Sequence, residues 1–219
     1  MQIVYCDNRI VVVIKPVGII STEVRGGLPF LVRRQLGCEC IRTVHRLDAQ
    51  VSGLMVLARS AEAASILSRQ IREQTFHKEY LAVVHGEPPE RGTLRDLLGR
   101  DKERRITYVA QEAGQGIQEA ILHYDVLDRC KGNSLVSIVL ETGRTHQIRV
   151  QFASRGFPLA GDRKYGLGGE DFPIALWSRR LSFQHPETGE HMDFSLLPPC
   201  KGAWLPFAGS DLFSAANQN

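Results

Sequence analysis

The stretch Thr43–Leu54 most constrains what this chain can fold into. It places Asp48 two residues after Arg46 and three after His45, and Ser52-Gly53 then precedes an apolar run from Leu54 to Ala58. A Ser-Gly pair marks a tight turn or a close backbone approach, and the apolar run is typical of a buried strand. The carboxylate is therefore expected just before a buried strand. A polar surface loop between two strands is the alternative, because most charged loop residues are simply solvated.

Composition limits the classes of protein to consider. With 219 residues, of which 43% are hydrophobic, the chain can bury a full core as one large domain or two small lobes. Its 27 Lys+Arg and 24 Asp+Glu give a formal charge of +3. This balance is only mildly basic, so binding to nucleic acid would depend on local clusters of arginine. The N-terminal apolar run carries charged residues and is neither a signal peptide nor a membrane span.

The cysteines point to a reducing compartment and away from a metal site. Five are scattered along the chain, which favours reduced thiols in a cytoplasmic protein. Cys38 and Cys40 are the one pair at a suggestive spacing, but no second Cys/His pair lies at ligand spacing. The sequence shows no P-loop and no dinucleotide fingerprint. We therefore expect no metal, no cofactor and no membrane association.

Periodicity predicts an α+β chain rich in strands. A hairpin is expected over residues 3–14. A short helix should end at Leu36 with Gly37 as its cap, and a second helix should run from Ser60 to about Gln74. A strand is expected over residues 78–84. Residues 91–116 are predicted to be mostly a solvated loop. Two strands, 117–127 and 135–141, are expected to be joined by 128–133, and a helix is expected to begin at Thr145 or the residue before it and to end at Gly156. A last hairpin covers residues 176–196, and the small polar tail 208–219 is expected to fray.

Four ordered blocks of the sequence resemble the RluA-type pseudouridine synthases. They are Lys15-Pro16-Val17-Gly18, the HRLDxxxSGL stretch around Asp48, Lys78-Glu79-Tyr80, and Thr142–Gln151 with the block that follows it. The resemblance extends over residues 3–199 and implies a catalytic domain at 1–207 without an S4-type RNA-binding module. The fold that it implies is a mixed, mostly antiparallel sheet in two halves, with outer helices and a central cleft. The strand-rich pattern predicted from the sequence agrees with this fold.

The resemblance also implies an activity and a set of site residues. The expected reaction isomerises uridine to pseudouridine in structured tRNA or ribosomal RNA after the base flips out. Asp48 matches the nucleophile, Tyr80 the active-site tyrosine and Arg144 a partner that keeps Asp48 ionised and oriented. Arg46 matches the arginine that fills the vacated stack, and Ile148 would line the pocket. We expect a monomer whose partner is RNA.

Several alternatives stay open at this point. Asp48 could attack C1′ or abstract a 2′ proton to form a glycal, and we favour the glycal route. An RNA-binding relative that has lost catalysis is the second possibility. A hydrolytic glycosidase is disfavoured because such enzymes pair two carboxylates across the bond. The chain departs from the family at Val51, where threonine is usual, and at Leu176-Trp177-Ser178, where Leu-His-Ala is common. The second departure bears on the choice of substrate.

Overall fold

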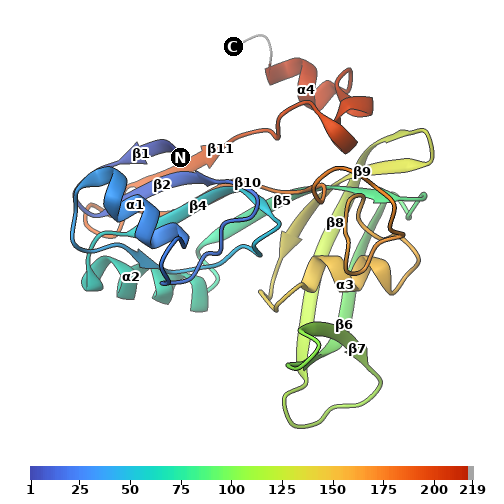
Figure 1. The fold of residues 1–219 in the computed structure, drawn as a ribbon, viewed down its shortest axis with the longest axis horizontal. Helices are drawn as coiled ribbons and strands as arrows, with labels where there is room; N and C mark the ends of the chain where they lie inside the picture. The colour runs from blue at the N-terminus through green and yellow to red at the C-terminus, as the bar shows by residue number, and fades with distance from the viewer. Residues whose placement is uncertain (217–219) are drawn as a thin grey trace. The chain divides into compact units, whose positions relative to one another are not determined.

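The computed structural model describes residues 1–216, which divide into two compact units (Figure 1). Unit 1 comprises Met1–Glu79 and Trp177–Leu196. Unit 2 comprises Tyr80–Leu176 and the described residues from Leu197 onward. Two of the three boundaries fall inside strands, β5 (His77–His85) and β10 (Leu176–Gln184), and the third follows Leu196. The segment predicted as one catalytic domain is therefore built from two units that share two strands.

Unit 1 is a mixed sheet with two helices. Its β1–β2, β2–β4, β3–β4 and β10–β11 pairs are antiparallel, and β4 and β10 are parallel. The elements besides β5 and β10 are β1 (Gln2–Cys6), β2 (Ile10–Lys15), α1 (Leu28–Leu36), β3 (Arg42–Thr43), β4 (Ser52–Ala58), α2 (Ala61–Arg72) and β11 (His191–Ser195).

The core of unit 1 follows from the alternation of side chains along its strands. Ile10 and Val12 of β2 face the same side as Leu54, Val56 and Ala58 of β4, since successive strand residues point to opposite faces. The apolar stripe of α2 packs on this face through Ala63 and Leu67. The Phe76 and Phe183 rings stack with centroids 5.0 Å apart. Residues 10–13 are fully buried, so β2 is buried on both faces.

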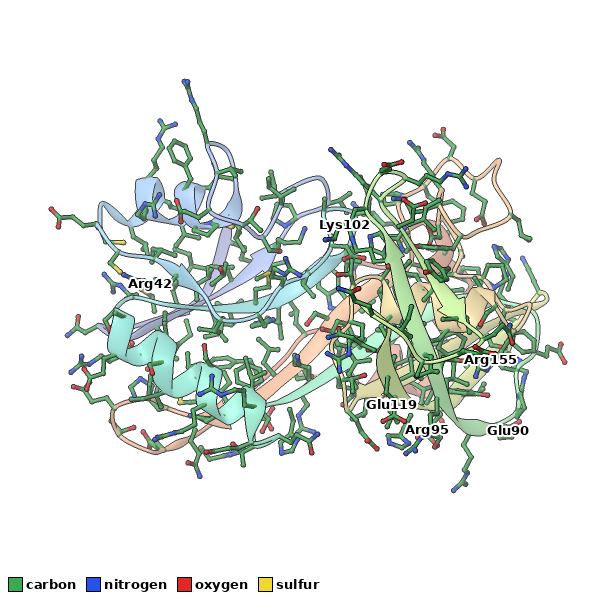
Figure 2. All side chains as sticks on the ribbon, turned by 90° about the horizontal axis from the view of Figure 1, so that it is seen from below. Arg42, Glu90, Arg95, Lys102, Glu119 and Arg155 are labelled. Atoms are coloured by element: carbon green, nitrogen blue, oxygen red, sulfur yellow. The ribbon has the colours of Figure 1, made fainter. Side chains whose placement is uncertain are left out.

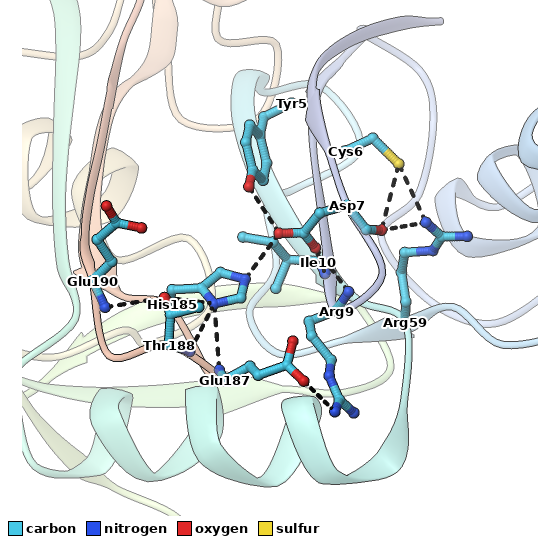
Figure 3. Close-up of polar contacts among 10 residues, drawn as sticks. All are labelled: Tyr5, Cys6, Asp7, Arg9, Ile10, Arg59, His185, Glu187, Thr188 and Glu190. Carbon is cyan, nitrogen blue, oxygen red and sulfur yellow. Dashed lines mark hydrogen bonds and ion pairs between the residues drawn. The ribbon is translucent and has the colours of Figure 1, made fainter.

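A polar cluster ties two turns of unit 1 together (Figure 3). The carboxylate of Asp7 accepts bonds from the backbone N–H groups of Arg9 and Ile10, at 2.7 and 2.8 Å, and from the Tyr5 hydroxyl at 2.8 Å. It also contacts Nε2 of His185, in the β10–β11 turn, at 2.9 Å. Burial raises the pKa of Asp7, but these hydrogen bonds outweigh it and the pKa lies below its ordinary value. The turn between β1 and β2 is thereby fixed to the turn between β10 and β11.

Unit 2 is built on strands in the order β5-β9-β8-β6-β7, in which the β9–β8, β8–β6 and β6–β7 pairs are antiparallel. The Val150 side chain of α3 packs with Leu98 and Ala120 of the sheet. Phe152, also in α3, meets the Tyr124 ring edge-on at 5.2 Å. The elements besides β5 are β6 (Arg91–Asp101), β7 (Ile106–Ala110), β8 (Gln118–Cys130), β9 (Asn133–Leu140), α3 (Gln147–Ala153), the 3-10 helix η1 (Gly202–Phe207) and α4 (Asp211–Ala216).

Residues 91–116 are not the loop that the sequence predicted. They contain β6 and β7, and β6 pairs with β8 from Arg91↔Asp125 to Leu98↔Gln118. Charged residues lie on the solvent side of these strands, as Arg95 and Glu119 do, where they form an exposed ion pair (Figure 2). Hydrogen bonds along the ladder, which local sequence does not reveal, outweigh the unfavourable strand propensity of Gly and Asp in β6.

Other boundaries were predicted closely. Gly37 ends α1 in the left-handed conformation (φ +61°), and the Ser60 side chain accepts a bond from the Ala63 N–H at the start of α2.

The connection between β8 and β9 is shorter than the predicted 128–133, because both strands extend to Cys130 and Asn133. Within the predicted tail, residues 211–216 form α4 and Phe213 is buried. Residues 217–219 lie outside the described part of the chain.

The predicted fold class is confirmed. The strands form mixed and mostly antiparallel pairings in two units, with few helices. Among the helices of residues 1–216, none is long and apolar enough to cross a bilayer.

Candidate active site

Asp48 lies in an irregular segment between β3 and β4 of unit 1. Its carbonyl oxygen accepts a bond from the Val51 N–H at 3.0 Å, which closes a tight turn before the strand. Leu47 before it is buried, whereas the Asp48 side chain is partly exposed. The chain is therefore buried at Leu47 while Asp48 itself stays partly exposed. This matches the predicted position of the acid just before a buried strand.

Lys15 is a buried cation close to Asp48. Its side chain is fully buried, and Nζ donates to the carbonyl oxygens of Pro16, Ile19 and Ala49 at 2.8, 2.7 and 3.1 Å. Burial lowers the pKa of Lys15 to about 8, against the opposing attraction of the Asp48 carboxylate. An ammonium has three N–H donors, and all three are used here.

His45 in the same segment is buried and neutral. Its Nε2 accepts a bond from the backbone N–H of Val56 at 3.2 Å. The β3–β4 ladder ends at Thr43↔Leu57, so the imidazole bonds to a strand position that the ladder leaves open. Burial lowers the pKa of His45 to about 3, with a smaller effect from Lys78. Arg46, next in sequence, is exposed.

Tyr80 and Ile148 lie in unit 2 and are buried. Tyr80 is in β5 and Ile148 is in the first turn of α3, and each is 5% exposed. Their apolar surfaces therefore face the protein rather than bulk solvent.

Arg144 lies in the turn that precedes α3. Its side-chain Nε donates to the Glu119 carbonyl oxygen at 2.9 Å, and its backbone N–H donates to Oε1 of Gln147 at 2.9 Å. The helix begins at Gln147, later than the predicted start at Thr145 or the residue before it. His146 adopts the left-handed conformation (φ +55°), which lies outside the helical region. The Gln147 side-chain oxygen accepts from both the Arg144 backbone N–H and the Thr142 hydroxyl, which fixes the backbone of this turn.

Arg149 is a buried charge that the sequence analysis did not single out. Its Nε and one terminal nitrogen donate to the two carboxylate oxygens of Asp162, at 2.8 and 2.7 Å. Burial raises the pKa of Asp162, but the Arg149 bonds and charge outweigh it and the net shift is downward. The guanidinium also lies 5.1 Å from the centroid of the Tyr165 ring. The missed signal was a second arginine in the Thr142–Gln151 block, on a helix whose neighbours are apolar.

The two departures from the family pattern are both buried: Val51, Trp177 and Ser178 belong to unit 1, and Leu176 is the last residue of its segment of unit 2. Val51 is 2% exposed. The Trp177 indole donates its N–H to the Leu196 carbonyl oxygen at 2.8 Å, and Ser178 beside it is fully buried. Tryptophan at this position is thus held by β10 and the residue that follows β11.

The predicted residues are therefore divided between the units. Asp48 and Arg46 belong to unit 1, and Tyr80, Arg144 and Ile148 belong to unit 2. Within the described residues, no group of three or more His, Cys, Asp or Glu side chains could hold a metal ion.

Comparisons with known proteins identify the family. The sequence model of the family described as RNA pseudouridylate synthase matches residues 9–154. This span contains Asp48, Tyr80 and Arg144. Among curated proteins, the chain is 35% identical over 218 residues to the ribosomal large subunit pseudouridine synthase D of Neisseria meningitidis serogroup A, covering 89% of this chain and 57% of that protein. It is 36% identical over 212 residues to the uncharacterized RNA pseudouridine synthase YlyB of Bacillus subtilis, covering 89% and 68%.

A solved structure agrees with these sequence relatives. The human RNA pseudouridylate synthase domain containing 1 superposes with a TM-score of 0.77 at 26% identity, over 93% of this chain and 85% of that one. The chain spans just over half the length of the Neisseria relative. The sequence match over most of the chain and the shared fold lead to one conclusion: this chain belongs to the RNA pseudouridylate synthase family, as its resemblance to the RluA type predicted.

Proposed function

We propose that the chain is an RNA pseudouridine synthase that isomerises uridine to pseudouridine in structured tRNA or ribosomal RNA. The observation that carries the proposal is the family match over residues 9–154, which includes the segment around Asp48. The reaction replaces the N1–C1′ glycosidic bond by a C5–C1′ bond, and C5 releases its proton while N1 takes one up. Nothing is oxidised and no group enters, so no cofactor is required.

Asp48 is proposed as the nucleophile of this reaction. Its partly exposed side chain lies on a fixed backbone, and nucleophilic carboxylates react in their ionised form. The Lys15 ammonium and the Asp48 carboxylate attract each other, which opposes the effect of burial on Lys15. Direct attack at C1′ would make Asp48 a nucleophile in the strict sense. We favour the alternative route, in which the same carboxylate acts as a base and removes the 2′ proton to give a glycal.

Other residues are proposed to assist at the base. Tyr80 stacks on the uracil and helps to move a proton, Ile148 lines the pocket and Arg144 orients Asp48 through its planar guanidinium. Arg46, which is exposed, fills the stack left by the flipped nucleotide, whose extrusion costs a few kcal/mol. RNA is the proposed partner of a monomeric, cytoplasmic protein, and its five free cysteines agree with a reducing compartment.

The test is release of tritium from RNA labelled at C5 of uridine. Asp48→Asn should abolish release while RNA affinity stays within about tenfold, ~1.4 kcal/mol, because the side chain is nearly isosteric. Asp171→Asn is the matched control, since Asp171 is an exposed aspartate of unit 2. RNA binding without release by the wild-type chain would indicate a relative that has lost catalysis. Mapping pseudouridines in cellular RNA with and without the gene would identify the uridine.

A further inference from the structure

The segment from Lys15 to Ser21, which leaves β2 toward α1, bonds to the backbone on both sides of Asp48. Ser21 contacts Leu47, the residue before Asp48, and Lys15 contacts Ala49, the residue after it. All of these residues belong to unit 1.

The Ser21 hydroxyl satisfies both backbone groups of Leu47. It donates to the Leu47 carbonyl oxygen at 2.7 Å and accepts from the Leu47 N–H at 3.1 Å. Ser21 is 3% exposed and Leu47 is 6% exposed, so water has little access to replace either bond. One hydroxyl thus performs the pairing that a neighbouring strand would otherwise provide.

The Ala49 carbonyl oxygen is held by two donors of the same segment. The Gly18 N–H donates to it at 2.7 Å and Nζ of Lys15 donates at 3.1 Å. Burying an ammonium is costly, whereas a neutral donor could have filled the same position. The retained charge is attracted by the Asp48 carboxylate, which opposes the effect of burial on the pKa of Lys15.

We propose that Ser21 and Lys15 are positioning residues, which fix the backbone of Asp48 from both sides so that its carboxylate is held in the reactive orientation. This inference rests on the proposed function, because it assumes that Asp48 carries the chemical step. A displacement of about 1 Å at a reacting group can slow the reaction by on the order of a hundredfold. Neither residue needs to touch the RNA to have this effect.

Gln70 provides a control for loss of stability alone. Its side-chain amide donates to the Gln184 carbonyl oxygen at 2.8 Å and accepts from the Gln184 N–H at 2.9 Å. It is 6% exposed and lies in the same unit as Ser21. The Gln70–Gln184 bridge therefore has the same design as the Ser21–Leu47 bridge, on strand β10 instead of beside Asp48.

The experiment compares Ser21→Ala, Lys15→Met and Gln70→Leu in the full chain. Single-turnover tritium release, RNA affinity and urea unfolding are measured for each. Ser21→Ala and Lys15→Met should lower the single-turnover rate by tenfold to a hundredfold, with RNA affinity changed by less than about threefold. Gln70→Leu should lower the unfolding midpoint while the folded protein keeps the wild-type rate. Ser21→Thr, which keeps the hydroxyl, should recover most of the rate.

Amide exchange supplies a readout besides activity. The Leu47 N–H should exchange faster in Ser21→Ala than in the wild-type chain, while amides of β2 stay protected. If Ser21→Ala does not fold, Ser21→Cys replaces it, because a thiol is a weaker donor and acceptor of similar size. If the Ser21 variant or Lys15→Met keeps the wild-type rate while Asp48→Asn is inactive, the positioning role of that residue is overturned and the proposed function stays intact. Equal rate losses in Gln70→Leu would also overturn it. If Asp48→Asn keeps its rate, the proposed function itself fails.

Discussion

Gly53 and Ser178 pack backbone against backbone where β4 runs parallel to β10. A Cβ on residue 53 would lie 2.5 Å from the Ser178 amide nitrogen and closer still to its carbonyl oxygen. Gly53 also has φ +119°, a conformation that L side chains rarely adopt. The Ser-Gly pair after Asp48 therefore marks a close approach that only glycine permits.

This contact predicts the effect of Gly53→Ala on stability. The substitution should lower the free energy of unfolding by at least about 2 kcal/mol, because backbone strain adds to a clash that cannot relax. Gly189→Ala is the matched control in the same unit: its φ is +72° but no atom lies within 4 Å of the added Cβ. Its loss should be about 1 kcal/mol. Urea denaturation measures both, and equal losses would contradict the clash.

Asp162→Asn should be strongly destabilising. It leaves the Arg149 guanidinium without its buried counter-charge, a change that costs about 3–5 kcal/mol. Asp193→Asn removes an exposed partner of Arg180 and should cost less than about 1 kcal/mol. Because the pKa of Asp162 lies below its ordinary 3.8, its contribution is fully present above that value and is lost as the pH falls through the folded pKa. Thermal unfolding of both variants at pH 7 tests the difference.

His45 should lower the free energy of unfolding in mild acid. Its pKa is lowered from 6.5 to about 3, so between these values the unfolded chain binds a proton that the folded chain does not. Stability must then fall as the pH decreases through this window. His45→Gln, which keeps an acceptor but does not titrate, should show a flatter decrease between pH 6.5 and 4. His77→Gln, at an exposed position in the same unit, should leave the slope unchanged. Urea titrations at several pH values measure it.

The single-turnover rate should decrease at alkaline pH, when Lys15 loses its proton. Above its pKa of about 8, Lys15 loses one N–H donor and the charge that faces Asp48, so the single-turnover rate should fall. Stability should not fall with it: the folded pKa is below the ordinary 10.5, so this group's contribution to stability rises between the two values. Lys15→Met should lack the alkaline decrease that the wild-type rate shows. A decrease of equal steepness in that variant would assign it to another group.

Arg144→Lys separates orientation of Asp48 from attraction to RNA. Lysine keeps the charge but loses the planar pair of donors. If Arg144 orients the nucleophile, the chemical step should slow by on the order of a hundredfold. The salt dependence of RNA binding should hardly change. Single-turnover rates and affinities at several salt concentrations test both parts. Normal turnover with a shallower salt slope would make Arg144 a phosphate contact.

Features with a local cause could be predicted from the sequence. The ends of α1 and α2 depend on residues within one turn, such as Gly37 and Ser60, and the hairpins follow the alternation of apolar residues. The motif around Asp48 placed the acid beside a buried strand and indicated the family. These local patterns predict the structure correctly because each depends only on residues that are neighbours in the chain.

The tertiary structure decided the features that join distant residues. The strands in 91–116 exist because β8 offers a ladder to pair with, and the full burial of Lys15 follows from the Ala49 carbonyl, 34 residues away. Likewise the charge of Arg149 is accommodated inside the protein because Asp162 meets it there. Propensity describes a residue and its neighbours, whereas hydrogen bonds and ion pairs between remote segments form only once the chain has brought their partners together.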